Sequence, residues 1–89
     1  MLSLKDCLDF CDLECREIEA IAEHEHVPLM LAIEMGSQLM GSDDGLRQVH
    51  QMMREDIEHA LQEGHMEHAS ELTATYLHFR RLHPLPEAA

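Results

Sequence analysis

The sequence predicts an all-α fold, a small bundle of four or five short helices that is joined by tight turns and completed by homo-oligomerisation. Apolar residues recur at the three- and four-residue spacing of helices, and no segment alternates with the period of two that marks a strand. The few Gly and Pro residues divide the 89-residue chain into helix-length pieces. A chain of this size buries only a modest core, so association with a second copy would stabilise it. We expect a single helical domain over residues 1–83 and a flexible Pro-containing tail over residues 84–89.

The first helix is expected over residues 4–26, where an apolar stripe follows Ser3 as a suitable N-cap. Asp12 is a competing N-cap, from which a separate helix could begin, and the sequence alone leaves both starts open. The stripe includes three cysteines at four-residue spacing: Cys7, Cys11 and Cys15. They lack the Cys-x-x-Cys spacing of common zinc sites, so we interpret them as core residues, with a thiolate site for zinc or copper(I) as the alternative.

A second helix is expected over residues 28–40, because Pro28 suits the first turn of a helix. Its polar residues occupy only a narrow strip, so most of its circumference is apolar. Such a helix has to be covered on two sides, by its own fold or by another chain. One side carries Leu31, Met35 and Leu39, which we expect to form the interface of a homo-oligomer.

The third and fourth helices are expected over residues 43–63 and 66–82. Ser42 is a good N-cap for the third helix, and Gly64 suits the position after its end. The residues expected on the inward face of the third helix are Leu46, Val49, His50, Met53, Ile57, Ala60 and Leu61. Those expected on the inward face of the fourth are Ala69, Leu72, Tyr76 and Phe79.

The charge of the chain excludes two classes of partner. Eighteen acidic residues against six basic ones give a formal net charge of −12, which repels phosphate backbones and anionic membrane surfaces. No apolar run is long enough to span a bilayer. We therefore expect neither nucleic acid nor a membrane as a partner. The N-terminal segment does not read as a signal peptide, which favours a cytoplasmic location.

The densest group of potential metal ligands is the Glu-His-Glu-His segment at residues 23–26, at the expected end of the first helix. At about 100° per residue, Glu25 shares the apolar stripe and His26 lies at its edge, while the other two residues project into solvent. We expect His50 to be a hydrogen-bonded core residue and Glu25 to reach solvent at a helix end. If Glu25 and His50 meet, they and the adjacent His26 would form a site for iron, zinc or nickel, with His65 as a further ligand.

Two carboxylate-x-x-His motifs, at residues 23–26 and 56–59, resemble the ligand spacing of ferritin-like di-iron bundles. The further carboxylates would be Glu34 with Glu67 or Glu71. The resemblance is confined to these residues. In ferritin-like proteins the motifs point into the middle of long helices, whereas here the second helix is short and the first carboxylate projects away from the apolar stripe.

The sequence favours a non-enzymatic protein, because it contains no Gly-rich phosphate loop, nucleophile elbow or catalytic Cys–His signature. The first hypothesis is a small, acidic protein–protein interaction or regulatory module that acts as a homo-oligomer or with a protein partner. The alternative is a helical protein that binds a divalent metal ion, which is the one cofactor that the residues suggest.

Overall fold

The computed structural model describes residues 13–86, and this range contains four helices and no strand. The helices are α2 (Cys15–Glu25), α3 (Leu29–Leu39), α4 (Asp43–Gln62) and α5 (Met66–Leu82). The predicted all-α class is confirmed, and the bounds of α3, α4 and α5 agree with the predicted ranges to within one residue. None of the helices in residues 13–86 combines the length and apolar character needed to cross a membrane.

The first predicted helix, over residues 4–26, is not continuous through residues 13 and 14, because α2 begins at Cys15. This start agrees with the alternative of a separate helix that begins near Asp12. The N-cap of α2 is Glu14, which has an extended backbone and whose N–H donates to the side-chain Oε1 of Glu17 at 2.8 Å. Glu17 is itself buried, and burial raises the pKa of its carboxyl. The competing cap at Asp12, and two of the three cysteines, lie outside the described residues.

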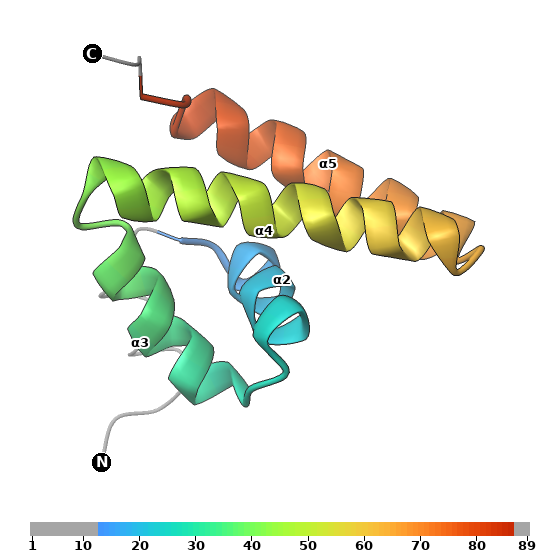
Figure 1. Ribbon diagram of the computed structural model, residues 1–89, viewed down its shortest axis with the longest axis horizontal. Helices are drawn as coiled ribbons and strands as arrows, with labels where there is room; N and C mark the ends of the chain where they lie inside the picture. The colour runs from blue at the N-terminus through green and yellow to red at the C-terminus, as the bar shows by residue number, and fades with distance from the viewer. Residues whose placement is uncertain (1–12, 87–89) are drawn as a thin grey trace.

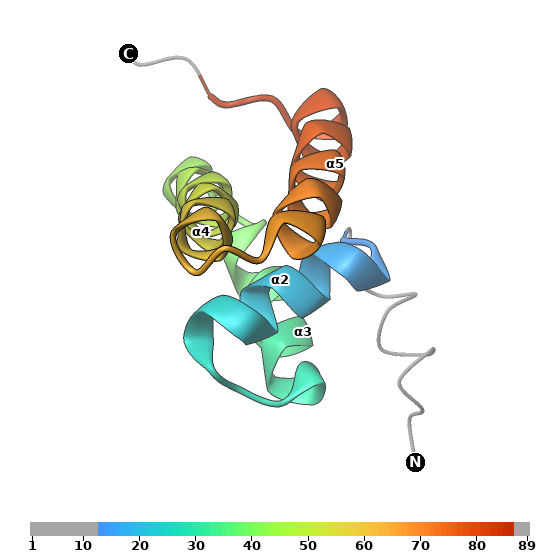
Figure 2. The ribbon, with the colours of Figure 1, turned by 90° about the vertical axis from the view of Figure 1, so that its right-hand side faces the viewer.

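The four helices form two layers. Figure 1 shows α4 and α5 side by side as an antiparallel hairpin, and Figure 2 shows α2 crossing beneath this hairpin with α3 below it. In agreement with these views, α2 packs against the other three helices, while α3 packs against α2 and α4. The end of α2 therefore lies close to both helices of the hairpin.

The core lies between the two layers and contains apolar residues from every helix. Its buried apolar residues are Leu13, Ile18, Ala20, Ile21, Ala32, Ile33, Val49, Met52, Met53, Ala60, Ala69, Leu72, Tyr76 and Phe79. All four residues that were predicted to face inward on α5 are among them. Two other inward predictions are wrong, because Leu61 is 49% exposed and Cys15 lies on the surface.

Two joints define the paths of the helices. The α2–α3 joint passes through His26, whose left-handed backbone (φ 57°) ends α2 two residues before Pro28. At the α3–α4 joint, Ser42 caps α4 as predicted, since its Oγ accepts a hydrogen bond from the N–H of Gly45 at 3.0 Å. Gly45 lies very close to the backbone of Leu39. A Cβ atom on residue 45 would be 1.9 Å from the carbonyl oxygen of Leu39.

Candidate functional site

His50, one of the predicted metal ligands, is a fully buried core residue whose two ring nitrogens are both occupied. Its Nε2 lies 2.7 Å from the carbonyl oxygen of His83, and its Nδ1 lies 3.1 Å from the hydroxyl of Tyr76. A carbonyl oxygen can only accept, so Nε2 carries the proton and the Tyr76 hydroxyl donates to Nδ1. The ring also packs edge-on against Tyr76 and Phe79. His50 therefore acts as the hydrogen-bonded core residue that the sequence favoured, linking α4 to the end of α5.

The other three predicted ligands lie elsewhere. Glu25 is half-buried beside the start of α4, whereas His26 and His65 line a groove between the end of α2 and the α4–α5 hairpin. In the part of the chain that the structure describes, no group of three His, Cys, Asp or Glu side chains is already arranged to hold a metal ion. The structure thus does not gather Glu25, His26, His50 and His65 into one ligand set.

A different group of ionisable side chains converges at this groove, which has a volume of about 430 Å³. We call it the His-carboxylate groove. The ionisable residues that line it are Glu23, His24, His26, Glu55, Asp56, His59, His65 and His68. They come from α2, α4 and α5 and from the turns that follow α2 and α4, so the groove exists only because α2 crosses the hairpin.

The Glu-His-Glu-His segment is divided between two sides of α2, and the division differs from the one predicted. Glu23 and His24 were both expected to be solvated. Glu23 is exposed as expected, whereas His24 is partly buried, and both side chains contact the hairpin. The side chain of His24 is only 26% exposed. Glu25, which shares the apolar stripe and was expected to reach solvent at the helix end, is half-buried and lines a separate groove on the α3 side of the molecule. The left-handed turn at His26 and the crossing of α2 under the hairpin set these directions.

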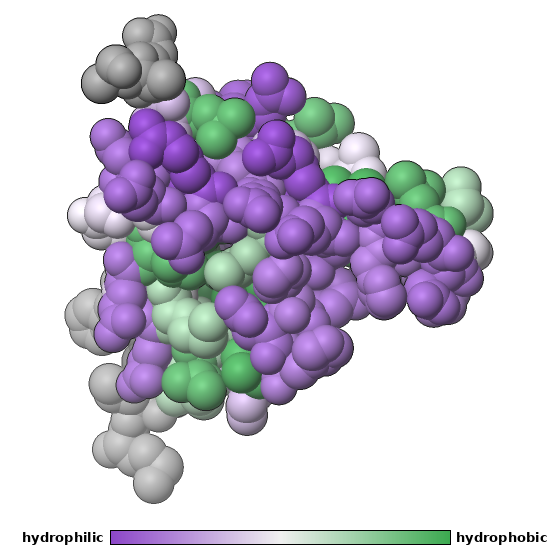
Figure 3. All heavy atoms as spheres, viewed as in Figure 1, coloured by the Kyte–Doolittle hydropathy of each residue, from purple (hydrophilic) through white to green (hydrophobic). Residues whose placement is uncertain are grey.

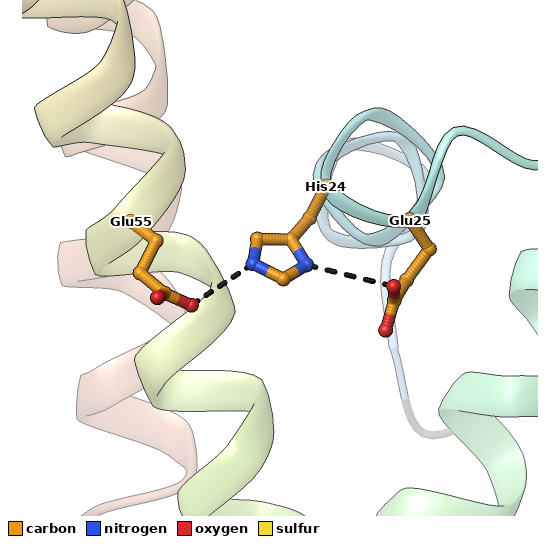
Figure 4. Close-up of polar contacts among 3 residues, drawn as sticks. All are labelled: His24, Glu25 and Glu55. Atoms are coloured by element: carbon orange, nitrogen blue, oxygen red, sulfur yellow. Dashed lines mark hydrogen bonds and ion pairs between the residues drawn. The ribbon is translucent and has the colours of Figure 1, made fainter.

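Two His–carboxylate pairs hold α2 to the hairpin at this groove. His24 Nε2 lies 2.9 Å from Oε1 of Glu55 on α4, and His68 Nε2 of α5 lies 2.7 Å from Oε1 of Glu23. Figure 4 shows the His24 ring between Glu55 and Glu25, with Nδ1 directed to Oε2 of Glu25 at 3.9 Å. The ring of His24 is thus flanked by a carboxylate on each side.

Asp56 lies at the buried end of the groove. It is 7% exposed, and within residues 13–86 its Oδ2 has no hydrogen-bond partner. Burial first, and then the neighbouring charge of Glu23, raise the pKa of Asp56 from 3.8 to about 7. A carboxyl group with this burial and this pKa is typical of functional sites.

The two carboxylate-x-x-His motifs, at residues 23–26 and 56–59, place all four of their terminal residues on the wall of this groove. The remaining members of the ferritin-like set do not join them. Glu34 is exposed on α3, and Glu71 lines another pocket with Arg16. The two motifs therefore identified four residues of the groove, but not His24, Glu55 and His68, which also line it.

The burial of Asp56 was not predicted, although the sequence carries a signal for it. Asp56 follows Val49 by seven residues and precedes Ala60 by four, so all three share one face of α4. Both neighbours are buried, and Asp56 is buried with them. The roles of His24, Glu55 and His68 had no comparable signal, because they depend on the angle at which α2 crosses the hairpin.

The predicted interface residues lie on the other layer of the molecule. Leu31 is 44% exposed, while Met35 and Leu39 are half-buried. Met35 and Leu39 line a second groove of about 260 Å³, together with Met52 of α4. Figure 3 shows green, apolar atoms gathered over the region of α3, beside the largely purple surface of α4. We call Leu31, Met35 and Leu39, with this groove, the α3 surface.

In comparisons with protein-family models, curated proteins and solved structures, no significant match to this chain was found. The fold and the two surfaces therefore define it only as a small all-α protein with an apolar α3 surface and a separate His-carboxylate groove. Its function has to be argued from these residues alone.

Proposed function

We propose that the protein is a non-catalytic interaction or regulatory module that self-associates as a homodimer through the α3 surface. The observation that carries this proposal is the position of Leu31, Met35 and Leu39. They follow one another at four-residue spacing along α3 and lead from the exposed Leu31 into the groove beside α4. A helix of a second copy, laid along this stripe, would remove apolar side chains from water at about 25 cal/mol per Å².

The charge distribution supports a second copy as the occupant of this surface. The whole chain carries a formal charge of −12, yet α3 contains a single ionisable side chain, Glu34. Two copies that meet through α3 keep most of their acidic residues apart and in water. Leu82, an exposed apolar residue at the end of α5, is less suited to a dimer contact, because it directly follows the charged residues Arg80 and Arg81. Charged residues are depleted in the centres of interfaces.

The size of the chain supports the same proposal. A domain of 89 residues buries a smaller fraction of its surface than a larger domain does, and α3 contributes only three of its residues to the buried set. Covering the exposed side of α3 in a dimer enlarges the shared core. The half-buried Met35 is well suited to such a contact, because methionine adapts its shape to a partner.

The proposal is tested by Leu31→Glu, which places a charge at the exposed end of the α3 surface. We expect the variant to remain folded, because Leu31 is exposed within the chain, and to be monomeric by light scattering. The matched control is Leu77→Glu, which puts the same charge at a residue of α5 that is 55% exposed. This control should still dimerise. A Leu31→Glu variant that associates as strongly as the wild type would contradict the proposed interface.

A further inference from the structure

The geometry of the His-carboxylate groove points to a binding site for one divalent transition metal ion, of the class that includes zinc, with Asp56, His24 and His68 as ligands. The site lies on the opposite side of α2 from the α3 surface, and it does not depend on self-association. Imidazole and carboxylate groups together suit zinc and its neighbours in the first transition series.

An unpartnered buried oxygen lies in this groove. Within the described residues, three buried side-chain atoms lack a hydrogen-bond partner, and one of them is Oδ2 of Asp56, which lines the groove. A buried carboxylate oxygen without a donor is costly, since it loses its hydration and gains nothing in return. A bound cation supplies the missing partner of Asp56.

The two histidine nitrogens that face the groove are each held by a carboxylate. His24 Nε2 lies 2.9 Å from Oε1 of Glu55, and His68 Nε2 lies 2.7 Å from Oε1 of Glu23. A metal ion bound at Asp56 requires both nitrogens to leave these carboxylates, whose side chains are 49% and 45% exposed and can return to water.

The orientation of His24 also suits a metal ligand. Its Nε2 faces the groove, and its Nδ1 faces Oε2 of Glu25 at 3.9 Å (Figure 4). Histidines that bind metals commonly donate the N–H of their other nitrogen to a carboxylate, which orients the ring and raises its basicity. Glu25 is placed for this role, as a positioning residue rather than a ligand.

Metal binding also requires side-chain movement, because no three donors in the described chain already surround a common point. The ligands differ in their freedom to move. Asp56 is held by packing, whereas the side chains of His68 and Glu23 are 42% and 45% exposed. His68 can thus turn toward Asp56 from the opposite wall, with Glu23 as the nearest further carboxylate. Binding should tighten the contact between α2 and the hairpin.

The test is calorimetric titration of the full-length, tag-free chain with zinc chloride. We expect one ion to bind per chain, and Asp56→Asn to weaken the affinity by about tenfold or more. The matched control is Asp44→Asn, which removes the same charge from an exposed residue of the same helix. It should leave the affinity nearly unchanged. Its result separates a ligand at residue 56 from a general effect of negative charge.

A second readout separates a ligand from a structural residue. Without zinc, Asp56→Asn should unfold at a temperature no lower than the wild type, because the amide has no charge to bury. Zinc should raise the unfolding temperature of the wild type but not that of Asp56→Asn or His24→Gln, since a ligand stabilises only the state that binds it. His78→Gln, which removes an exposed histidine of α5, should keep the zinc response.

The inference would be overturned by either of two results. The first is less than about a tenth of an ion bound per wild-type chain, because a built site is stoichiometric. The second is equal zinc affinity in the wild type and Asp56→Asn, which would mean that exposed histidines bind the metal. Neither result bears on the dimer, whose mass is measured without metal.

Discussion

His50 shows what a buried polar residue contributes in a core this small. Its ring joins Tyr76 on α5 to the carbonyl of His83, and it fills space beside Phe79. All of its hydrogen-bonding capacity is used in the neutral form, with the proton on Nε2. Burial lowers the pKa of His50 from its ordinary value of 6.5. The residue is therefore linked to the stability of the protein through pH.

The sign of this linkage follows from the direction of the shift. As pH falls below about 6.5, the unfolded chain takes up a proton at His50 while the folded chain does not, so the unfolded state is favoured. We predict that His50 makes the free energy of unfolding fall with decreasing pH, by at most about 1.4 kcal/mol per pH unit. The contribution is complete above the unfolded pKa and is lost below it.

Urea unfolding of the wild type and His50→Gln between neutral pH and pH 5 measures this contribution. The variant should be less stable at neutral pH, because packing and hydrogen bonds change, but its stability should depend less steeply on pH. The exposed His59→Gln controls for the loss of one imidazole from the surface. Parallel pH profiles for the wild type and His50→Gln would refute the prediction.

At this scale the sequence predicted buried apolar residues better than polar ones. Periodicity identified every inward residue of α5, and it favoured His50 as a core residue. It placed His24 in solvent, because a helical wheel registers a single apolar face, and it did not predict the contacts that His24 and the exposed Glu23 make with the hairpin. The second face of α2, which meets Glu55 and His68, is defined by contacts between helices that are distant in sequence.

For the individual helices, the joints show which features local sequence signals can predict. Local signals predicted three of them: Pro28 after α2, Ser42 before α4 and Gly64 after it, whose φ of 75° suits glycine. The sequence left two starts open for the first helix, and α2 begins near the later one, after Glu14, whose N–H donates to the side chain of the buried Glu17. The order in which the helices pack had no local signal.

The α3–α4 joint gives a direct test of these local contacts. A Cβ atom at Gly45 would lie 1.9 Å from the backbone oxygen of Leu39, and a backbone atom cannot move away as the end of a side chain can. We predict that Gly45→Ala lowers the free energy of unfolding by about 1 to 3 kcal/mol, the range for overpacked sites. The measurement is urea unfolding followed by circular dichroism.

Gly41→Ala is the control for this joint. A Cβ atom there would lie 3.3 Å from the backbone oxygen of Gln38, so it needs only a small adjustment. Its effect should be smaller than that of Gly45→Ala. Equal stability of the wild type and Gly45→Ala would show that α3 and α4 do not approach each other as closely as described.

The whole molecule has two surfaces with different chemistry, on opposite sides of α2. The His-carboxylate groove lies where the end of α2 meets the hairpin, and the α3 surface lies on the other layer (Figures 1 and 2). The all-α class followed from composition and periodicity. The division of the surface did not, because it depends on the crossing of α2 beneath α4 and α5.

The most direct test of the proposed function is the mass of the wild-type protein in solution. Sedimentation equilibrium of the metal-free chain should give a mass close to twice the chain mass of 10.2 kDa at micromolar concentration. The mass should fall toward that of one chain in Leu31→Glu. A wild-type mass of 10.2 kDa that stays constant as the concentration is raised would contradict self-association through α3.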